Sequence, residues 1–365
     1  MKVAHVTVVR ELTRGQLAQL SMEYESAKRL DTDEWFTLAY HDGEPLADYI
    51  RTTPRIFRSL FLRKLWAWIV VWRHSKRFDF VVIRHVSFDP MALFFSWFIK
   101  NYVSLHHAKD IEELRLIRRG WKGVAASQVE RITGAVATMN AAAILGVTSE
   151  IAQYVCCVHG IEKPRGIYSN GINPDRIPVL EDRREEGLVQ FAFVCGSFNE
   201  WHGLDKLIEA VDRSNDKDVR NLQIHLIGKL SREQIEQIES DERRLSVFKR
   251  HGVLSSEQYR TILAKCHAGI GSLAMERQSL REGSTLKVRE MLALGLPVYS
   301  GHFDVAFPEG AEFVRVVDGP SISDMLDFAE RSQSCSRAQV REASLAGISK
   351  LAAMQKALSS LDAVR

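Results

Sequence analysis

The chain has 365 residues, enough for two domains of ordinary size, each with its own core. An apolar content of 45% and a charged content of 26% are normal for a soluble globular protein and exclude general disorder. The formal net charge of +3 is too small to predict nucleic-acid binding, so a basic partner surface would have to be local.

Three further features of the sequence bear on where the protein works. No segment reaches the ~20 apolar residues that a membrane span requires. The five cysteines form no CxxC pair and no metal-ligand spacing. The N-terminus has the pattern of a short strand rather than a signal peptide. A cytoplasmic protein is therefore expected.

The first half of the chain alternates β-rich apolar runs with a helical pattern. Strands are expected over 3–9, 35–40, 78–83, 102–105 and 141–147, and a helix over 16–29. The alternation begins again with strands over 189–195, 222–227 and 298–300 and a helix over 203–211. Two such series predict an α/β fold with two doubly wound, Rossmann-like domains facing across a cleft.

The expected domain boundaries follow from composition. An N-terminal domain would span 1–172 and a C-terminal domain 188–345. The stretch 173–187, which holds two prolines and a charged run, is expected to be the linker. Residues 346–365 are expected to form a C-terminal helix that packs back on the N-terminal domain.

The most informative stretch lies across a loop-to-helix junction between Glu282 and Glu290. These two carboxylates are eight residues apart, and Lys287 lies between them. Ser284 or Thr285 can cap the helix, whose first turn would supply backbone N–H groups to a phosphate. Carboxylates can accept hydrogen bonds from sugar hydroxyls, so this stretch predicts a nucleotide-sugar site.

Several motifs in the same order resemble the family-4 retaining glycosyltransferases of the GT-B fold. Glu282 and Glu290 match the family's Glu-x7-Glu motif. The run 169–173 is similar to its interdomain Asn-Gly element, and 196–210 is similar to the loop and helix that open its donor domain. The resemblance implies donor binding in the C-terminal domain, acceptor binding in the N-terminal domain, and no metal or other cofactor.

The resemblance also implies roles for residues of the donor site. Glu290 would accept hydrogen bonds from the ribose hydroxyls. Glu282 would contact the donor sugar and stabilise positive charge at the anomeric carbon, as a catalytic residue. The other donor-binding residues that it implies are Gly196, Ser284, Thr285, Leu286 and Asn170.

One departure from the family concerns the cations that hold the diphosphate. Ser197 and His202 stand where an Arg and a Lys are expected. Lys287 is the best candidate to replace them, and Lys229 is next. His202 could donate a hydrogen bond, or add charge if it is protonated.

The N-terminal domain supplies weaker candidates. His106 and His107 follow the strand at 102–105, where the family often has a histidine near the reacting sugar; a surface histidine pair is the alternative. Their role would be to position the donor sugar and the leaving group. Arg10 and Arg14, after the first strand, could contact phosphate or acceptor. Asp31-Thr-Asp33 resembles a metal-binding DxD motif, but its place between a helix and a strand favours a solvated turn, so no metal is assigned to it.

The segment 54–77 combines seven basic residues with five aromatic ones. Such a helix suits the surface of an anionic bilayer, and 91–99 adds a second aromatic patch. Crossover helices packed on the sheet are the alternative. Membrane contact would place the protein at the inner face of the membrane and would fit a lipid-linked acceptor.

The leading hypothesis is a retaining, metal-independent glycosyltransferase. It would move a sugar from a nucleotide-diphosphate sugar to a glycan or lipid-linked acceptor, in cell-surface polysaccharide or glycolipid biosynthesis. The alternative is a degenerate GT-B protein that binds a nucleotide or glycan without catalysis, which the missing Arg and Lys favour. A GT-B epimerase shares the architecture but not the Glu-x7-Glu motif.

Overall fold

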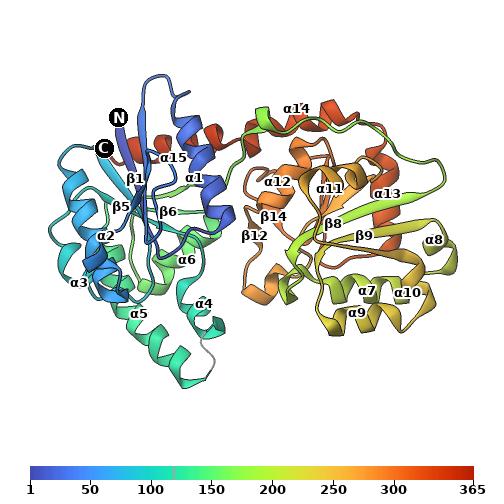
Figure 1. Ribbon diagram of the computed structural model, residues 1–365, viewed down its shortest axis with the longest axis horizontal. Helices are drawn as coiled ribbons and strands as arrows, with labels where there is room; N and C mark the ends of the chain where they lie inside the picture. Colours follow the sequence, from blue (N-terminus) through green and yellow to red (C-terminus); the bar gives the residue numbers. More distant parts are fainter. Residues whose placement is uncertain (118–119) are drawn as a thin grey trace. The chain divides into compact units, whose positions relative to one another are not determined.

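The computed structural model describes residues 1–117 and 120–365, and the chain divides into two compact units (Figure 1). The first unit comprises Met1–Asn173 with Lys350–Arg365, and the second comprises Pro174–Ser349. The chain therefore crosses between the units twice, and its last helix, α15 (Lys350–Asp362), belongs to the first unit. No helix in the described part of the chain is long and apolar enough to cross a membrane.

The stretch expected to be a linker, 173–187, belongs almost entirely to the second unit. The backbone N–H of Leu180 donates to the carbonyl of Leu294 at 3.0 Å, and that of Arg183 donates to the carbonyl of Ala264 at 3.1 Å. These two hydrogen bonds hold residues 180–183 against the second unit, a few residues after the chain has left the first unit.

The first unit is built on a parallel sheet of seven strands in the order β3-β2-β1-β4-β5-β6-β7. The strands are β1 (Lys2–Val8), β2 (Glu34–His41), β3 (Ile50–Thr52), β4 (Phe80–Arg84), β5 (Tyr102–His106), β6 (Ala143–Gly146) and β7 (Arg165–Ile167). The chain adds strands on one side of β1 and then returns to add β4 on its other side. This is the expected doubly wound topology.

Helices cover both faces of this sheet. They are α1 (Arg14–Ala27), α2 (Leu60–Ser75), α3 (Ala92–Phe95), α4 (Asp110–Ile117), α5 (Trp121–Asn140), α6 (Ser149–His159) and α15, with a short 3-10 turn η1 (Arg55–Phe57). Successive residues of β1 point to opposite faces. Ala4 and Val6 pack in a core with α2, α3, α5 and α6, whereas Val3 packs in a core with α15.

The second unit has a parallel sheet of six strands in the order β10-β9-β8-β11-β13-β15. These are β8 (Val189–Ser197), β9 (Leu222–Lys229), β10 (Phe248–Gly252), β11 (Ala268–Ile270), β13 (Val298–Ser300) and β15 (Val314–Val316). A separate pair joins β12 (Glu282–Gly283) to β14 (Phe303–Asp304). This unit is also doubly wound, so the expectation of two such domains is confirmed.

The helices of the second unit again lie on two faces. They are α7 (Leu204–Arg213), α8 (Asp216–Arg220), α9 (Arg232–Glu239), α10 (Glu242–Val247), α11 (Ser256–Leu263), α12 (Leu286–Ala293), α13 (Ile322–Ser332) and α14 (Arg337–Ile348), with 3-10 turns η2 (Pro174–Arg176), η3 (Glu200–His202) and η4 (Met275–Gln278). Phe191 and Phe193 of β8 pack in one core with α7, α8 and α13. On the other face, Met291 of α12 packs directly on Gly269 of β11.

The segment 54–77, expected either to face a membrane or to pack on the sheet, buries one face of α2 in the core. Trp66 and Trp68 of α2 are 8% and 3% exposed. The ring of Trp66 stacks on Phe57, and the indole N–H of Trp68 donates to Asp89 Oδ2 at 2.8 Å. The prediction that these two indoles contribute to a membrane-facing surface is therefore wrong, because they already fill the space between α2 and the sheet.

A buried carboxylate, Glu23 of α1, holds the first unit together. It is 2% exposed and accepts hydrogen bonds from the indole N–H of Trp35 at 2.9 Å and the hydroxyl of Thr37 at 2.7 Å, both on β2. His5 Nδ1 lies 2.9 Å from both of its oxygens, and the hydroxyl of Tyr168 donates to Oε2. Nζ of Lys350, at the start of α15, lies 4.0 Å away. Burial raises the pKa of Glu23, but His5 and Lys350 outweigh it and hold the pKa well below its usual value.

We expect Glu23→Gln to lower the free energy of unfolding of the first unit by about 3 kcal/mol, because it removes the buried negative charge that faces Nζ of Lys350 and disrupts a buried hydrogen-bond network. Urea denaturation at pH 7 measures this. Since the pKa of Glu23 lies below its ordinary value, its contribution is present above that value, about 4.5, and is lost as pH falls below it. The difference between the two proteins should therefore shrink in acid.

Glu11→Gln is the matched control, because the Glu11 side chain is 85% exposed. It should change the free energy of unfolding by less than about 0.5 kcal/mol. Equal stability of the Glu23 and Glu11 variants would contradict the role given to Glu23.

Candidate functional site

In each sheet, one pair of neighbouring strands marks the point where the order of strands reverses. In the second unit this pair is β8 and β11, because the chain runs from β8 outward to β10 and then returns to β11. Ligands of doubly wound sheets bind outside the carboxyl ends of the strands at such a point. A ligand site of the second unit is therefore expected among the side chains at the carboxyl ends of β8 and β11.

Lys287, in the first turn of α12, lies beside the carboxyl end of β8. Its ammonium donates to Cys195 Sγ at 3.5 Å and lies 5.2 Å from the centre of the Phe193 ring. Burial lowers the pKa of Lys287, and Cys195 partly offsets that effect. Gly196 and Ser197, which follow Cys195, are exposed. The structure thus brings three of the predicted donor-site residues together at one edge of the sheet.

His202 lies close to Lys287 but carries no charge at neutral pH. Its Nδ1 accepts a hydrogen bond from the backbone N–H of Asn199 at 2.9 Å. Burial, and then the charge of Lys287, lower the pKa of His202 to about 4. The suggestion that a protonated His202 adds positive charge is therefore wrong near pH 7. The other predicted cation, Lys229, ends β9 and pairs in register with Ser197.

Of the two residues predicted to cap α12, Thr285 makes no such hydrogen bond, although it occupies the N-cap position. Its Oγ1 is buried and has no hydrogen-bond partner among the described residues. Ser284 is buried one position earlier, and Leu286 begins the helix. The first-turn N–H groups are therefore not used by the Thr285 hydroxyl, which leaves this helix start suited to an anion.

Glu282 lies on β12, which is held in place by close packing around Gly283. A Cβ atom on Gly283 would lie 2.4 Å from Cδ2 of His302, so only glycine fits next to that buried ring. Nδ1 of His302 lies 2.8 Å from Ser300 Oγ and 3.1 Å from the carbonyl of Ser272. This packing fixes the backbone of Glu282 beside the end of β13.

Two partners of α12 escaped the sequence reasoning. The hydroxyl of Tyr259, on α11, donates to the carboxylate of Glu290. Arg289 is fully buried and forms an ion pair with Asp304 of β14, with Nη2 2.8 Å from Oδ1. Tyr259 orients Glu290, and the Arg289–Asp304 pair anchors the helix. No sequence signal marked either pairing, because each joins elements that meet only in the fold.

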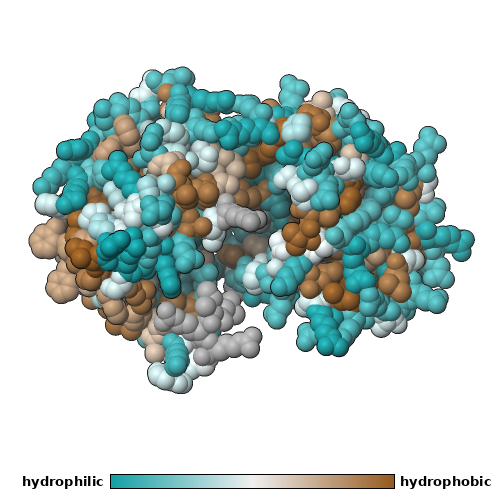
Figure 2. Space-filling model, viewed as in Figure 1, coloured by the Kyte–Doolittle hydropathy of each residue, from teal (hydrophilic) through white to brown (hydrophobic). Residues whose placement is uncertain are grey.

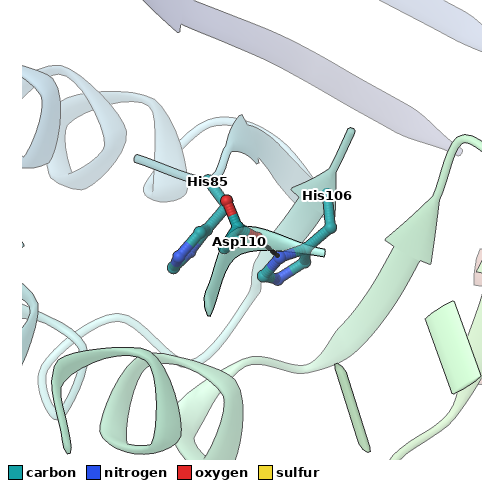
Figure 3. A group of neighbouring side chains, drawn as sticks. All are labelled: His85, His106 and Asp110. Atoms are coloured by element: carbon teal, nitrogen blue, oxygen red, sulfur yellow. Dashed lines mark hydrogen bonds and ion pairs between the residues drawn. The ribbon is translucent and has the colours of Figure 1, made fainter. Parts of the chain in front are cut away.

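In the first unit, His106 belongs to a buried cluster at the carboxyl ends of β4 and β5 (Figure 3). Its Nδ1 lies 2.9 Å from Asp110 Oδ2 and its Nε2 lies 3.0 Å from Ser104 Oγ. The ring of His85 stacks on it at 4.3 Å between centres, and His85 Nε2 lies 2.8 Å from Glu130 Oε1. Burial lowers the pKa of His85, but Asp110 and Glu130 outweigh it and raise the pKa to about 9. Burial and the neighbouring His85 lower the pKa of His106, so its imidazole is neutral.

Three of these side chains could hold a metal ion. One ligand atom from each of His85, His106 and Asp110 can be chosen so that all lie within 4.8 Å of one another. Nitrogen and carboxylate oxygen are ligands that zinc accepts. In the structure, however, His106 and Asp110 are hydrogen-bonded to each other, and a metal would have to displace that proton.

The remaining predicted residues of the first unit do not all join this cluster. Burial and the charge of Arg84 hold the pKa of His107 well below its usual value, so His107 is neutral and is no exposed surface histidine. Arg10 follows β1, and its side chain is 78% exposed. The side chain of Arg14 lies outside the described part of the structure. Asn170 follows β7 in the first unit.

No protein-family model matches the sequence, and no curated protein sequence matches it. Solved structures, in contrast, match over the whole chain. The lipopolysaccharide outer core galactosyltransferase WaaB superposes with a TM-score of 0.63 at 10% sequence identity, covering 100% of this chain and 99% of WaaB. This chain has the GT-B fold.

Two other solved structures share the GT-B fold with this chain. HepE of Anabaena, in complex with UDP and glucose, matches with a TM-score of 0.58 at 12% identity and covers 100% of both chains. WaaG, a glycosyltransferase involved in lipopolysaccharide biosynthesis, matches with a TM-score of 0.54 at 16% identity, covering 99% of this chain and 98% of WaaG. At such identities the similarity establishes the fold, so the activity has to be argued from residues.

Proposed function

We propose that this protein is a retaining, metal-independent glycosyltransferase. It moves a sugar from a nucleotide-diphosphate sugar to a glycan or lipid-linked acceptor, in the biosynthesis of cell-surface polysaccharide or glycolipid in the cytoplasm. The observation that carries the proposal is the place of Lys287. This cation lies at the start of α12, beside the end of β8 and at the reversal point of the second sheet.

The donor site follows from that placement. A diphosphate carries about two negative charges, and the start of α12 offers it first-turn N–H groups and the ammonium of Lys287. Glu290, three residues further along the helix, accepts hydrogen bonds from the ribose hydroxyls while Tyr259 holds its carboxylate. HepE, which shares the fold, has been solved with UDP and glucose, in support of a nucleotide sugar as donor.

The chemistry needs no protein nucleophile. The leaving diphosphate itself accepts the proton of the acceptor hydroxyl, and Glu282 stabilises the positive charge that develops at the anomeric carbon. His106 is neutral and is hydrogen-bonded through both nitrogens. It therefore helps to position the sugar by holding Asp110 in place at the end of β5, and it does not transfer a proton.

A membrane contact of the first unit fits a lipid-linked acceptor. Exposed apolar side chains occur at η1, the start of α2, and α3 with the segment after it, among them Ile56, Leu60, Phe94 and Phe98, which are 56–77% exposed. Figure 2 shows brown and tan side chains over the part of the first unit where Figure 1 places α2, α3 and α5. The same stretch of chain also carries exposed cations at Arg55, Arg73, Lys76 and Lys100. Exposed apolar side chains together with cations suit an anionic bilayer surface.

We expect Glu282→Ala and Glu290→Ala each to lower kcat/KM for sugar transfer by about 100-fold, because each removes a charged hydrogen-bond acceptor for the donor. Transfer from a panel of nucleotide sugars, followed by product analysis, measures this. Assays contain EDTA, because the proposed reaction uses no metal.

Glu342→Ala, an exposed glutamate on α14, is the matched control and should leave transfer unchanged. Full activity of both site variants would exclude the site. Activity that EDTA abolishes would refute the metal-independent reaction and would draw attention to the His85, His106 and Asp110 group.

We expect Lys287→Ala to weaken nucleotide-diphosphate binding by about tenfold or more, since it removes the buried cation nearest the helix start. Calorimetry with UDP, GDP, ADP and dTDP measures it. Lys217→Ala is the control, because α8 precedes β9 and so lies at the opposite edge of the sheet. His202→Asn should have the same small effect at pH 8 and pH 6, since the ring gains its proton only near pH 4. An affinity that Lys287→Ala leaves unchanged would rule out Lys287 as the phosphate-binding cation.

We expect the chain to sediment with phosphatidylglycerol vesicles and not with phosphatidylcholine vesicles. The double variant Phe94→Ser, Phe98→Ser should bind about tenfold more weakly or worse, because each exposed phenyl ring loses its burial in the bilayer. Val253→Ser, at a residue of the second unit that is 77% exposed, is the control. Equal sedimentation of the double variant and the control would refute this surface.

A further inference from the structure

The first unit has a pocket at the reversal point of its own seven-stranded sheet. In that sheet the strand order reverses between β1 and β4. A pocket of about 310 Å³ lies there, lined by residues that follow β1, the end of β4 and the first turns of α2. Its volume is at the low end for ligand pockets, so it suits one sugar residue or one phosphate group rather than a long chain.

The charged residues that line this pocket are all cationic. Arg10 follows β1, Arg84 ends β4 and His85 follows it, and Arg63 and Lys64 lie in the first two turns of α2. No Asp or Glu is among the described residues that line it. A pocket of the second unit shows that this is no general property of the surface, since Asp182, Glu185, Glu186, Asp218, Asp327 and Glu330 line that one.

The carboxylates that pair with these cations do not line the pocket, and they include Glu11, whose Oε1 lies 3.9 Å from Arg10 Nε. Arg63 Nη2 is 2.5 Å from Asp42 Oδ2, and the carboxylates of Glu113 and Asp110 act on Arg84. Neither Asp42, Asp110 nor Glu113 lines the pocket. Because charge interactions weaken with distance, a ligand in the pocket meets the cations first.

Arg63 is held firmly in the wall of the pocket. Its side chain is 13% exposed, and its Nε is buried with no hydrogen-bond partner among the described residues. Its Nη2 donates to Asp42 and to the carbonyl of Arg58, so the guanidinium is already fixed in place before an anion binds.

We propose that this pocket binds an anionic group of the acceptor, a phosphate ester or a sugar carboxylate next to the hydroxyl that receives the sugar. The proposal rests on the function proposed above and narrows its acceptor to an acidic one. Leu60 lines the pocket and is 56% exposed, so the pocket opens beside the apolar surface at the start of α2.

Calorimetry at low salt tests the pocket with glycerol 3-phosphate, glucuronate and neutral glucose as probes. At least one anion should bind about tenfold more tightly than glucose, because charge-assisted hydrogen bonds to arginine replace neutral ones. Arg10→Ala and Arg84→Gln should each weaken that anion by about three- to tenfold. The identity of the anion that binds distinguishes a phosphate from a carboxylate acceptor.

Arg77→Ala, an exposed residue of the first unit beyond the far end of α2, is the matched control and should bind like the unchanged chain. Because the Arg10 side chain is 78% exposed, Arg10→Ala should keep the native fold even if Arg84→Gln does not. The pocket proposal fails if both anions bind no better than glucose, or if Arg10→Ala binds like Arg77→Ala.

The same titrations separate this proposal from the function itself. Lys287→Ala should leave anion binding to the first unit unchanged while it weakens nucleotide binding. If the unchanged chain binds an anion but binds no nucleotide, the glycosyltransferase is refuted and the pocket proposal stands. Sugar transfer to a neutral acceptor, with no anion binding, would support the glycosyltransferase and refute the anion-binding pocket.

Discussion

The carboxylate of Glu23 is the contact on which the first unit depends. It receives hydrogen bonds from β2 and from Tyr168, lies against His5 of β1, and is close to Lys350. Tyr168 and Lys350 flank the two places where the chain crosses between units. A single buried charge therefore ties both crossings to the same part of the first sheet. Since α15 joins the chain only after the whole second unit, this carboxylate also makes the last helix part of the first core.

In the second unit, the corresponding constraint is the buried Arg289–Asp304 pair. It joins α12 to β14, and β14 pairs with the strand that carries Glu282. Lys287 and Glu290 lie on either side of Arg289 along the same helix. Side chains on a helix anchored in this way keep their positions without a ligand, which is the condition for binding a diphosphate without a large ordering cost.

The sequence was sufficient to predict the long strands and the two-domain class, because runs such as 3–9 and 189–195 are apolar and lie between helical patterns. Three-residue strands such as β11 and β15 were missed, since so short a run has no period. Whether Trp66 and Trp68 of α2 face a membrane or the sheet stayed open, because composition alone does not separate a core helix from an interfacial one. Tyr259 and Arg289 were missed because their partners come from other elements.

The two reversal points share one topology and differ in their chemistry. At the β1–β4 point five cationic side chains line a pocket, whereas at the β8–β11 point Lys287 lies beside the end of β8, next to a helix start that Thr285 does not cap. Helix N–H groups act at short range, so they bind a phosphate well in one position only. Long, flexible cationic side chains can bind anions of several shapes. The second unit is thus suited to one fixed ligand, as a donor site requires. The pocket of the first unit is suited to select its ligand by charge. The sugar that carries this charge would then determine which acceptor binds.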